Sequence, residues 1–203
     1  MKVSICRKTL IVLLAVLTAL VLVGCGGGVS GGGGGVNDDF TYTGRTVTVG
    51  GLTWMAENLN RPTKNSWCYD NDASNCEKYG RLYTWSAAMR ACPVGWRLPT
   101  RQDWDNLVSA AGGRDVAGEK LKSISGCMGD TGNGVDSLGF SALPGGYRAG
   151  ITYHGGGIIG HYWEAAELDT KFAYFWSIWC SHDGIMGGVG VEKGAGHSVR
   201  CVQ

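Results

Sequence analysis

The sequence predicts an α+β domain in which two early helices precede a glycine-rich region of short, mainly antiparallel strands, stapled by disulfides. Apolar residues recur at helical spacing in two stretches between residues 82 and 111, whereas beyond Gly126 only short apolar runs separated by glycines remain. The chain contains 35 glycines and eight tryptophans. This combination favours irregular turns packed around large aromatic side chains, and it argues against a bundle of long helices.

The first predicted element is a β-hairpin, because residues 46–49 and 52–55 alternate around a Gly50-Gly51 turn. A helix follows over residues 82–91, with apolar side chains at 82, 85, 88 and 89 on one face. A second helix starts at the capping-box-like Thr100-Arg-Gln-Asp103 and stops at Gly112-Gly113. Strands are expected at residues 140–143, 162–164, 172–179 and 198–202. The last strand can return to the first, which would bring the ends of the domain together.

The N-terminal segment predicts export. Lys2, Arg7 and Lys8 precede an apolar run over residues 10–23. Fourteen helical residues span about 21 Å, less than the roughly 30 Å of a bilayer core, which favours a signal peptide over a transmembrane helix. The run ends in Leu22-Val-Gly-Cys25, which is typical of the lipobox of bacterial lipoproteins, where the cysteine is acylated and becomes the first residue.

We therefore expect a signal peptide over residues 1–24, a lipidated Cys25 with a glycine-rich tether up to residue 38, and one domain over residues 39–203. Several acyl chains on one cysteine anchor a protein stably, so the membrane is the expected partner. The expected location is the bacterial cell envelope, at the outer membrane, and not the cytoplasm. The alternative is an ordinary secretory signal with a coincidental cysteine.

The charge of the chain argues against nucleic acid as a partner. Removing residues 1–24 takes away three basic residues, so 18 basic and 17 acidic residues become 15 and 17, and the formal charge changes from +1 to −2. The sequence contains no cluster of lysine and arginine that would contact phosphates.

Export makes disulfides the default state of the remaining cysteines. Cys6 leaves with the signal peptide, and six cysteines belong to the domain, at positions 68, 76, 92, 127, 180 and 201. Six cysteines allow fifteen pairings, and only Cys68–Cys76 is favoured by proximity. We expect no metal or other cofactor, because the cysteines form no C-x-x-C motif and the histidines at 154, 161, 182 and 197 show no ligand spacing. We interpret these histidines as scattered surface or loop residues.

The segment between Cys68 and Cys76 resembles a calcium loop, since Asp70, Asp72 and Ser74 alternate as the first ligands of such a loop do. The rest of the pattern fails. Asn75 stands where the turn needs glycine, and Arg81 stands where a bidentate glutamate is needed. Aspartate and asparagine also form tight turns without metal, so we interpret the segment as a loop clipped by Cys68–Cys76.

Five motifs follow one another over residues 44–203. They are Gly51-Leu-Thr-Trp-Met-Ala-Glu-Asn-Leu-Asn60, residues 68–85, Ala91-Cys-Pro-Val-Gly-Trp-Arg-Leu-Pro-Thr100, Leu138-Gly-Phe-Ser-Ala-Leu-Pro-Gly-Gly-Tyr-Arg148 and Gly196-His-Ser-Val-Arg-Cys-Val202. In this order they closely resemble the Fibrobacter succinogenes major paralogous domain. That family is similar to the C-type-lectin-like superfamily, which includes the formylglycine-generating enzymes, and the resemblance implies a C-type-lectin-like fold.

The resemblance implies a Cys92–Cys201 bridge, because both cysteines lie in family motifs. Cys127 and Cys180 occupy positions where the family leads us to expect no cysteine, and they most simply pair with each other. Two further departures are Arg97, where histidine is usual, and residues 162–167, where the family reads closer to Trp-Trp-Ser-(Ser/Ala)-Thr-Glu. A ligand surface in this region would be specific to this chain.

These observations favour a surface-facing, non-catalytic module that binds a glycan or a protein. Its candidate contacts are the aromatic residues Tyr162, Trp163, Trp176 and Trp179, because flat rings stack on sugars and anchor interfaces. Alternate residues of this segment must face the core, so some of these rings are expected inside. We do not expect calcium-dependent sugar binding, because the Glu-Pro-Asn, Gln-Pro-Asp and Trp-Asn-Asp signatures of such lectins are missing from the sequence.

Two alternatives remain. One is a structural or displayed surface protein without a small ligand. The other is an oxidase similar to the formylglycine-generating enzymes, whose chemistry needs late redox-active cysteines that are assigned to structural bridges here. No catalytic residue is predicted. Glu164 and Glu167 are three residues apart on an expected strand, which places their carboxylates on opposite faces.

The lipobox yields the first testable prediction. Cys25→Ala removes the acylated thiol, so the variant should accumulate as unprocessed precursor or leave the membrane fraction. Detergent-phase partitioning and the mass of the N-terminal peptide measure both effects. Normal processing and membrane retention of the variant would show that Cys25 is not the anchor.

Overall fold

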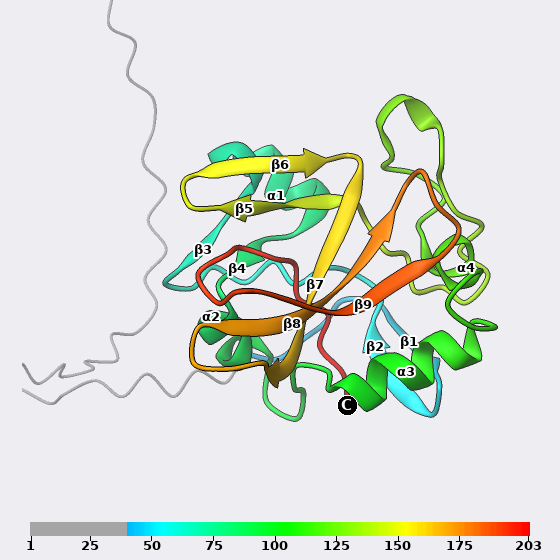
Figure 1. Ribbon diagram of the computed structural model, residues 1–203, viewed down its shortest axis with the longest axis horizontal. Helices are drawn as coiled ribbons and strands as arrows, with labels where there is room; N and C mark the ends of the chain where they lie inside the picture. The colour runs from blue at the N-terminus through cyan, green and yellow to red at the C-terminus, as the bar shows by residue number, and fades with distance from the viewer. Residues whose placement is uncertain (1–39) are drawn as a thin grey trace, which may run out of the picture. The chain divides into compact units, whose positions relative to one another are not determined.

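The computed structural model describes residues 40–203 and confirms an α+β domain (Figure 1). The strands are β1 (Thr46–Val49), β2 (Leu52–Met55), β3 (Ser66–Trp67), β4 (Leu82–Tyr83), β5 (Gly145–Ala149), β6 (Thr152–Gly156), β7 (Ile159–Glu167), β8 (Phe172–Trp179) and β9 (Ile185–Glu192). The helices are α1 (Ala73–Tyr79), α2 (Trp85–Ala91), α3 (Arg101–Ala110) and α4 (Ala117–Leu121), with 3₁₀ turns η1 (Tyr69–Asn71) and η2 (Met128–Asp130).

The main sheet has five strands in the order β6-β5-β7-β8-β9. All its neighbours are antiparallel except β5 and β7, which meet in parallel at Gly146 and Gly160. Two smaller antiparallel pairs, β1–β2 and β3–β4, lie outside this sheet.

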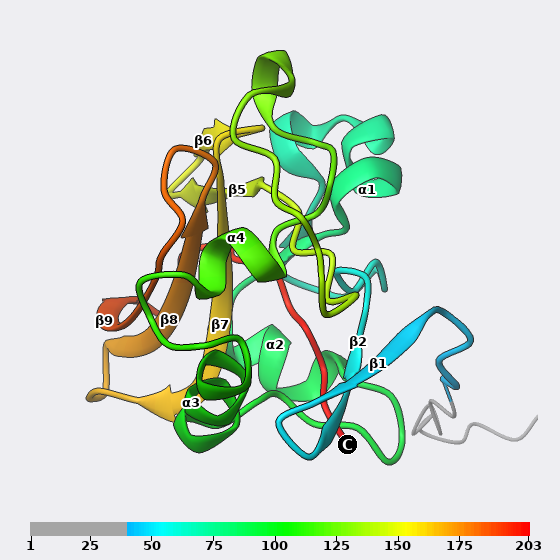
Figure 2. The same cartoon turned by 90° about the vertical axis from the view of Figure 1, so that its right-hand side faces the viewer.

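Strands β7 and β8 of the main sheet lie between two hydrophobic cores. Successive residues of β7 separate the cores: Tyr162 packs with Trp104 of α3, and Trp163 belongs to the core that contains Ala88 of α2. Side chains alternate across a strand, which is why neighbouring aromatic residues enter different cores. Figure 2 shows α3 and α4 packed alongside β7–β9.

The predicted hairpin is confirmed, with Val49 opposite Leu52 across the Gly50-Gly51 turn. The C-terminal segment returns to the hairpin, but it pairs with the second strand, β2, and not with the first as predicted. Figure 2 shows it running beside β2. Met55 donates its amide hydrogen to the carbonyl of Cys201 over 3.0 Å, and Thr53 and Gln203 exchange two such bonds. The segment does this through isolated bridges and not as the regular strand expected over residues 198–202.

The second predicted helix is confirmed as α3, with a capping box in which Thr100 and Asp103 each bond the other's backbone amide. The first was placed too early. Leu82 and Tyr83 form β4, and α2 begins only after Thr84, whose hydroxyl accepts from the amide of Ala87. Helical spacing of apolar residues could not separate this short buried strand from the helix that follows it.

The strand predicted over residues 140–143 is not formed. Ser141 has a φ of 52°, a left-handed conformation that a regular strand cannot contain. The carbonyls of Phe140 and Ser141 accept hydrogen bonds from Arg200 and not from a neighbouring strand. The sequence prediction missed β5, β6 and β9, which are rich in glycine, and the five-residue α4.

Three disulfides connect the described chain: Cys68–Cys76, Cys92–Cys201 and Cys127–Cys180. They are the pairs that proximity and the family resemblance indicated. Cys92–Cys201 closes a loop over a sequence separation of 109 residues and fastens the end of α2 to the C-terminal segment. In the chain-entropy model such a loop contributes roughly 4–5 kcal/mol to stability.

Arg200 is buried with 0% of its surface exposed, and its guanidinium joins distant parts of the chain. It donates to the side-chain carbonyl of Asn58 over 2.7 Å and to the backbone carbonyls of Met55, Phe140 and Ser141. The cation also lies 4.7 Å from the centre of the Phe140 ring. Four oxygen acceptors and an aromatic face therefore replace the water that burial removes.

Arg200→Met should destabilise the domain by about 3–5 kcal/mol, because it leaves four buried acceptors without a donor. Urea unfolding of the oxidised protein measures the change in free energy of unfolding. Arg90→Met is the matched control, since Arg90 is exposed in the last turn of α2, and it should change stability by about 0.5 kcal/mol or less. Equal effects of the two substitutions would contradict the central role of Arg200.

Candidate groove at the β8–β9 turn

Three of the four aromatic residues predicted to contact a ligand are inside the protein. Tyr162, Trp163 and Trp176 each have 0% of their surface exposed, and they belong to the two cores. The indole of Trp163 donates to the carbonyl of Tyr83, and the hydroxyl of Tyr162 donates to the carbonyl of Leu143. The prediction was therefore wrong for these three residues, because the central parts of β7 and β8 are covered on both faces.

Trp179 is the exception, because it is partly exposed at the end of β8 and lines an open groove. The groove has a volume of about 770 Å³, which lies within the usual range of ligand sites. It is bounded by the loop between α3 and α4, the β8–β9 turn and the first half of β9. Its lining residues are Arg114, Asp115, Trp179, His182, Asp183, Gly184, Ile185, Met186, Gly187 and Val189.

Backbone contacts hold the walls of this groove together. The amide of Ile185 donates to the carbonyl of Arg114, and the amide of Glu119 donates to the carbonyl of Asp183. Gly118 lets α4 approach the turn closely, since a Cβ at that position would lie 2.2 Å from the carbonyl oxygen of Gly184. The segment from the α3–α4 loop into α4 and the β8–β9 turn are therefore fixed to each other.

The buried side chain of Lys122 and the Cys127–Cys180 disulfide hold the β8–β9 turn in place. The ammonium of Lys122 donates to the carbonyl of His182 over 2.9 Å and to that of Cys180 over 3.4 Å. Burial lowers the pKa of Lys122, although Asp183 lies 3.9 Å away. Cys127–Cys180 ties the same turn to the segment before η2, and Gly132 packs where a Cβ would be 2.0 Å from the Cys180 carbonyl oxygen.

The groove combines an apolar lining with a charged rim. Met186 and Val189 are about half exposed, at 53% and 49%. The guanidinium of Arg114 lies 4.8 Å from the centre of the Trp176 ring and 3.3 Å from a carboxylate oxygen of Asp105. Asp115 and Asp183 present exposed carboxylates at the rim. Such a surface offers a flat indole together with hydrogen-bond acceptors.

The sequence prediction found only Trp179 among the residues of this groove. The others come from two segments far apart in the sequence, residues 114–115 and 182–189, and neither of them carries a recognisable binding motif. The nearest sequence signal was the unexpected Cys127–Cys180 pair, which marks the turn as a constrained element.

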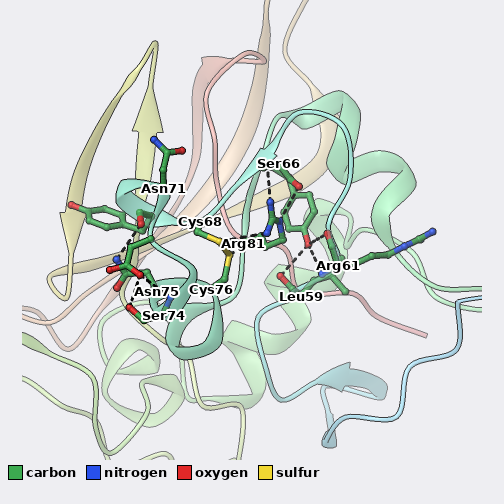
Figure 3. Close-up of a disulfide and its surroundings, with 12 residues drawn as sticks. Leu59, Arg61, Ser66, Cys68, Asn71, Ser74, Asn75, Cys76 and Arg81 are labelled. Atoms are coloured by element: carbon green, nitrogen blue, oxygen red, sulfur yellow. Dashed lines mark hydrogen bonds between the residues drawn. A yellow bond between two sulfur atoms is a disulfide. The ribbon is translucent and has the colours of Figure 1, made fainter.

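The segment between Cys68 and Cys76 contains η1 and the first turn of α1, so its expected description as a simple loop was incomplete (Figure 3). Asp72 is the N-cap of α1, where its carboxylate accepts from the amide and the hydroxyl of Ser74. These hydrogen bonds lower the pKa of Asp72. Arg81 extends toward the disulfide and donates to the Ser66 carbonyl. No group of three potential metal ligands occurs in the described chain.

The histidines are not all scattered surface residues, which corrects the sequence interpretation. His161 and His197 are buried together, with ring centres 5.0 Å apart. His197 stacks on Trp163 at 4.3 Å, and His161 stacks on Tyr147 at 4.6 Å. Burial lowers the pKa of His161 to about 4 and that of His197 well below its usual value. Both rings are therefore neutral near pH 7.

The two glutamates of β7 lie on opposite faces, as their spacing predicted. Glu164 is fully buried, accepts from the indole of Trp176 over 2.8 Å, and lies 3.3 Å from the guanidinium of Arg101. Burial raises the pKa of Glu164. Glu167 is exposed and pairs with Lys193. They cannot act as a pair of carboxylates on one substrate.

The family model described as Fibrobacter succinogenes major domain matches residues 47–203. The chain belongs to this family. No curated protein and no solved structure matches the chain. No helix in the described residues is long and apolar enough to cross a membrane. The expected lipidation site, Cys25, lies outside those residues, as does the signal peptide.

The departures from the expected pattern of the Fibrobacter succinogenes major domain lie at two places in the fold. Arg97 binds the Asp103 carboxylate that caps α3, so this change serves the scaffold. Cys180 adjoins the groove. Glu164 accepts a hydrogen bond from the indole of Trp176, and the ring of Trp176 contacts Arg114 in the groove lining. The groove is thus built partly from residues that the family pattern did not lead us to expect.

The buried histidine pair predicts acid sensitivity. The unfolded chain binds protons below about pH 6.5, whereas folded His161 binds one only near pH 4, so stability is full at neutral pH and falls as the pH decreases. At pH 5 the loss should be about 2 kcal/mol from His161, with a further loss from His197. Urea unfolding between pH 8 and 5 measures it.

His161→Phe should flatten this pH dependence, because phenylalanine keeps the stacking and removes the titrating ring. His154→Phe is the matched control, since His154 also stacks on Tyr147 but is exposed. It should leave the pH profile unchanged. A profile that His161→Phe does not alter would exclude the buried ring as the cause.

Proposed function

We propose that this protein is a lipid-anchored, surface-facing protein of the bacterial outer membrane, whose domain is a non-catalytic module that binds a glycan. The lipobox at Cys25 and the glycine-rich tether support the anchor. The family resemblance, the helices, the antiparallel sheet and the three disulfides support a C-type-lectin-like fold for the domain.

The observation that carries this proposal is the groove at Trp179. Its partly exposed indole lies among aliphatic side chains, with Asp115 and Asp183 at the rim. Sugar rings present apolar CH faces together with hydroxyl donors, so an aromatic ring next to carboxylate acceptors matches both features. The groove is also fixed by Lys122 and Cys127–Cys180, which limits the entropy lost on binding.

We propose a non-catalytic module because the cysteine, glutamate and histidine side chains that could react are already engaged in the fold. All six cysteines of the domain are paired in disulfides. Glu164 is occupied by Trp176 and Arg101, and His161 and His197 are enclosed by aromatic rings. A display protein without a ligand remains the second proposal, and a binding experiment separates the two.

Trp179→Ala should weaken retention of the protein by neutral polysaccharides about tenfold or more, because aromatic anchors typically contribute about 2 kcal/mol. Affinity electrophoresis in gels containing soluble glucan, xylan or mannan measures retention. Trp96→Ala is the control, since Trp96 is also partly exposed but contacts Tyr42 away from the groove. Trp179→Phe should keep part of the binding.

Equal retention of wild type and Trp179→Ala on every glycan would favour the display protein. Loss of retention in Trp96→Ala as well would indicate that the effect comes from general destabilisation and not from the groove. Circular dichroism of each variant separates these outcomes.

A further inference from the structure

A second hollow of about 530 Å³ is bounded by η2 and the β6–β7 turn. Asp183 of the β8–β9 turn lines both this hollow and the groove. Each hollow alone has the size of a small-ligand site. The residues that line the second hollow are Met128, Thr131, Gly132, Gly157, Ile158, Cys180, Ser181 and Asp183.

Exposed apolar side chains gather along both hollows. Eleven large hydrophobic side chains are exposed in the described chain, and four of them line these two hollows. Met128 and Ile158 line the second hollow, while Met186 and Val189 line the first. Single exposed apolar residues need no explanation, but exposed apolar residues that gather along hollows are typical of an interaction surface.

The polar groups that line the two hollows disfavour a negatively charged ligand. Asp115 and Asp183 supply carboxylates, and Thr131 and Ser181 supply hydroxyl groups. The one cation in the lining, Arg114, is already engaged by Asp105 and the Trp176 ring. Carboxylates accept hydrogen bonds from sugar hydroxyls and repel the carboxylates of acidic sugars.

The turn between the hollows is held in place, so the two hollows keep a fixed spacing. Lys122 bonds the carbonyls of Cys180 and His182, and Cys127–Cys180 fastens the turn to the segment that enters η2. A surface that is already fixed loses little conformational entropy when a ligand binds. An extended chain that fills both hollows therefore gains contacts in the second hollow without any rearrangement of the turn.

Building on the proposed function, we propose that the two hollows form one continuous site for an uncharged oligosaccharide or polysaccharide chain. The chain crosses the β8–β9 turn at Asp183. Trp179 contacts one part of it, and Met128 and Ile158 contact the other. The ligand is thus a stretch of neutral polymer several sugars long and not a terminal sugar.

Titration calorimetry of the full-length protein in detergent tests this. The probes are gluco-, xylo- and manno-oligosaccharides of two and six units, with hexagalacturonic acid as the acidic counterpart. For the neutral series that binds, the hexamer should bind about tenfold or more tightly than the dimer, because it fills both hollows. Hexagalacturonic acid should show no binding.

A double substitution in the second hollow locates the chain. Met128→Ala with Ile158→Ala should reduce hexamer affinity to nearly that of the dimer and leave dimer binding unchanged. Both side chains are exposed, so folding should be unaffected. Ile151→Ala is the matched control, an 85% exposed aliphatic residue between β5 and β6, and it should change neither affinity.

The outcomes separate the two proposals. Equal affinities for dimer and hexamer, both abolished by Trp179→Ala, would overturn the chain site and leave the glycan-binding groove standing. Tight binding of hexagalacturonic acid would overturn the preference for neutral polymers. No Trp179-dependent binding of any sugar, or binding of extended apolar peptides instead, would overturn both.

Discussion

The buried guanidinium of Arg200 is the interaction on which the rest of the domain depends. Removing a cation from water costs several kcal/mol, and no carboxylate of residues 40–203 forms an ion pair with this one. Four oxygen atoms from Asn58, β2 and residues 140–141 take the place of water, together with the Phe140 ring. Three segments far apart in the sequence must therefore meet at one point before any of them is satisfied.

This constraint explains local features that are otherwise unrelated. Residues 140–141 give their carbonyls to Arg200, so they cannot form a regular strand. The next residue, Cys201, carries the disulfide to Cys92, which keeps the C-terminal segment in register with β2. The hydrogen bonds and the disulfide thus act on the same short stretch, and each makes the other geometrically possible.

The groove is held together by contacts of a different kind from those of the core. Its walls come from turns that approach each other backbone to backbone at Gly118 and Gly132, and a buried lysine and a disulfide lock them. None of these contacts involves Arg200. The surface at the β8–β9 turn can therefore vary in side chains while the two-core scaffold keeps its packing, which is how one fold presents different surfaces.

Local signals in the sequence were enough to predict several elements. The Gly50-Gly51 hairpin, the capping box of α3 and strand β8 were predicted because turn chemistry, side-chain capping and alternation act within a few residues. The family resemblance indicated two of the three disulfide pairs. The return of the C-terminal segment to the hairpin was predicted too, although the segment pairs with β2 and forms no regular strand.

Which aromatic residues face solvent depends on packing between distant parts of the chain. Strands β7 and β8 are covered on both faces, which buries Tyr162, Trp163 and Trp176, while Trp179 stays partly exposed at the end of β8. The covering segments come from elsewhere in the chain, so the strands alone do not show which rings they bury. The burial of His161 and His197 has the same cause. The groove could not be predicted for the same reason, because its walls are residues 114–115 and 179–189, which meet only when α4 packs against the β8–β9 turn.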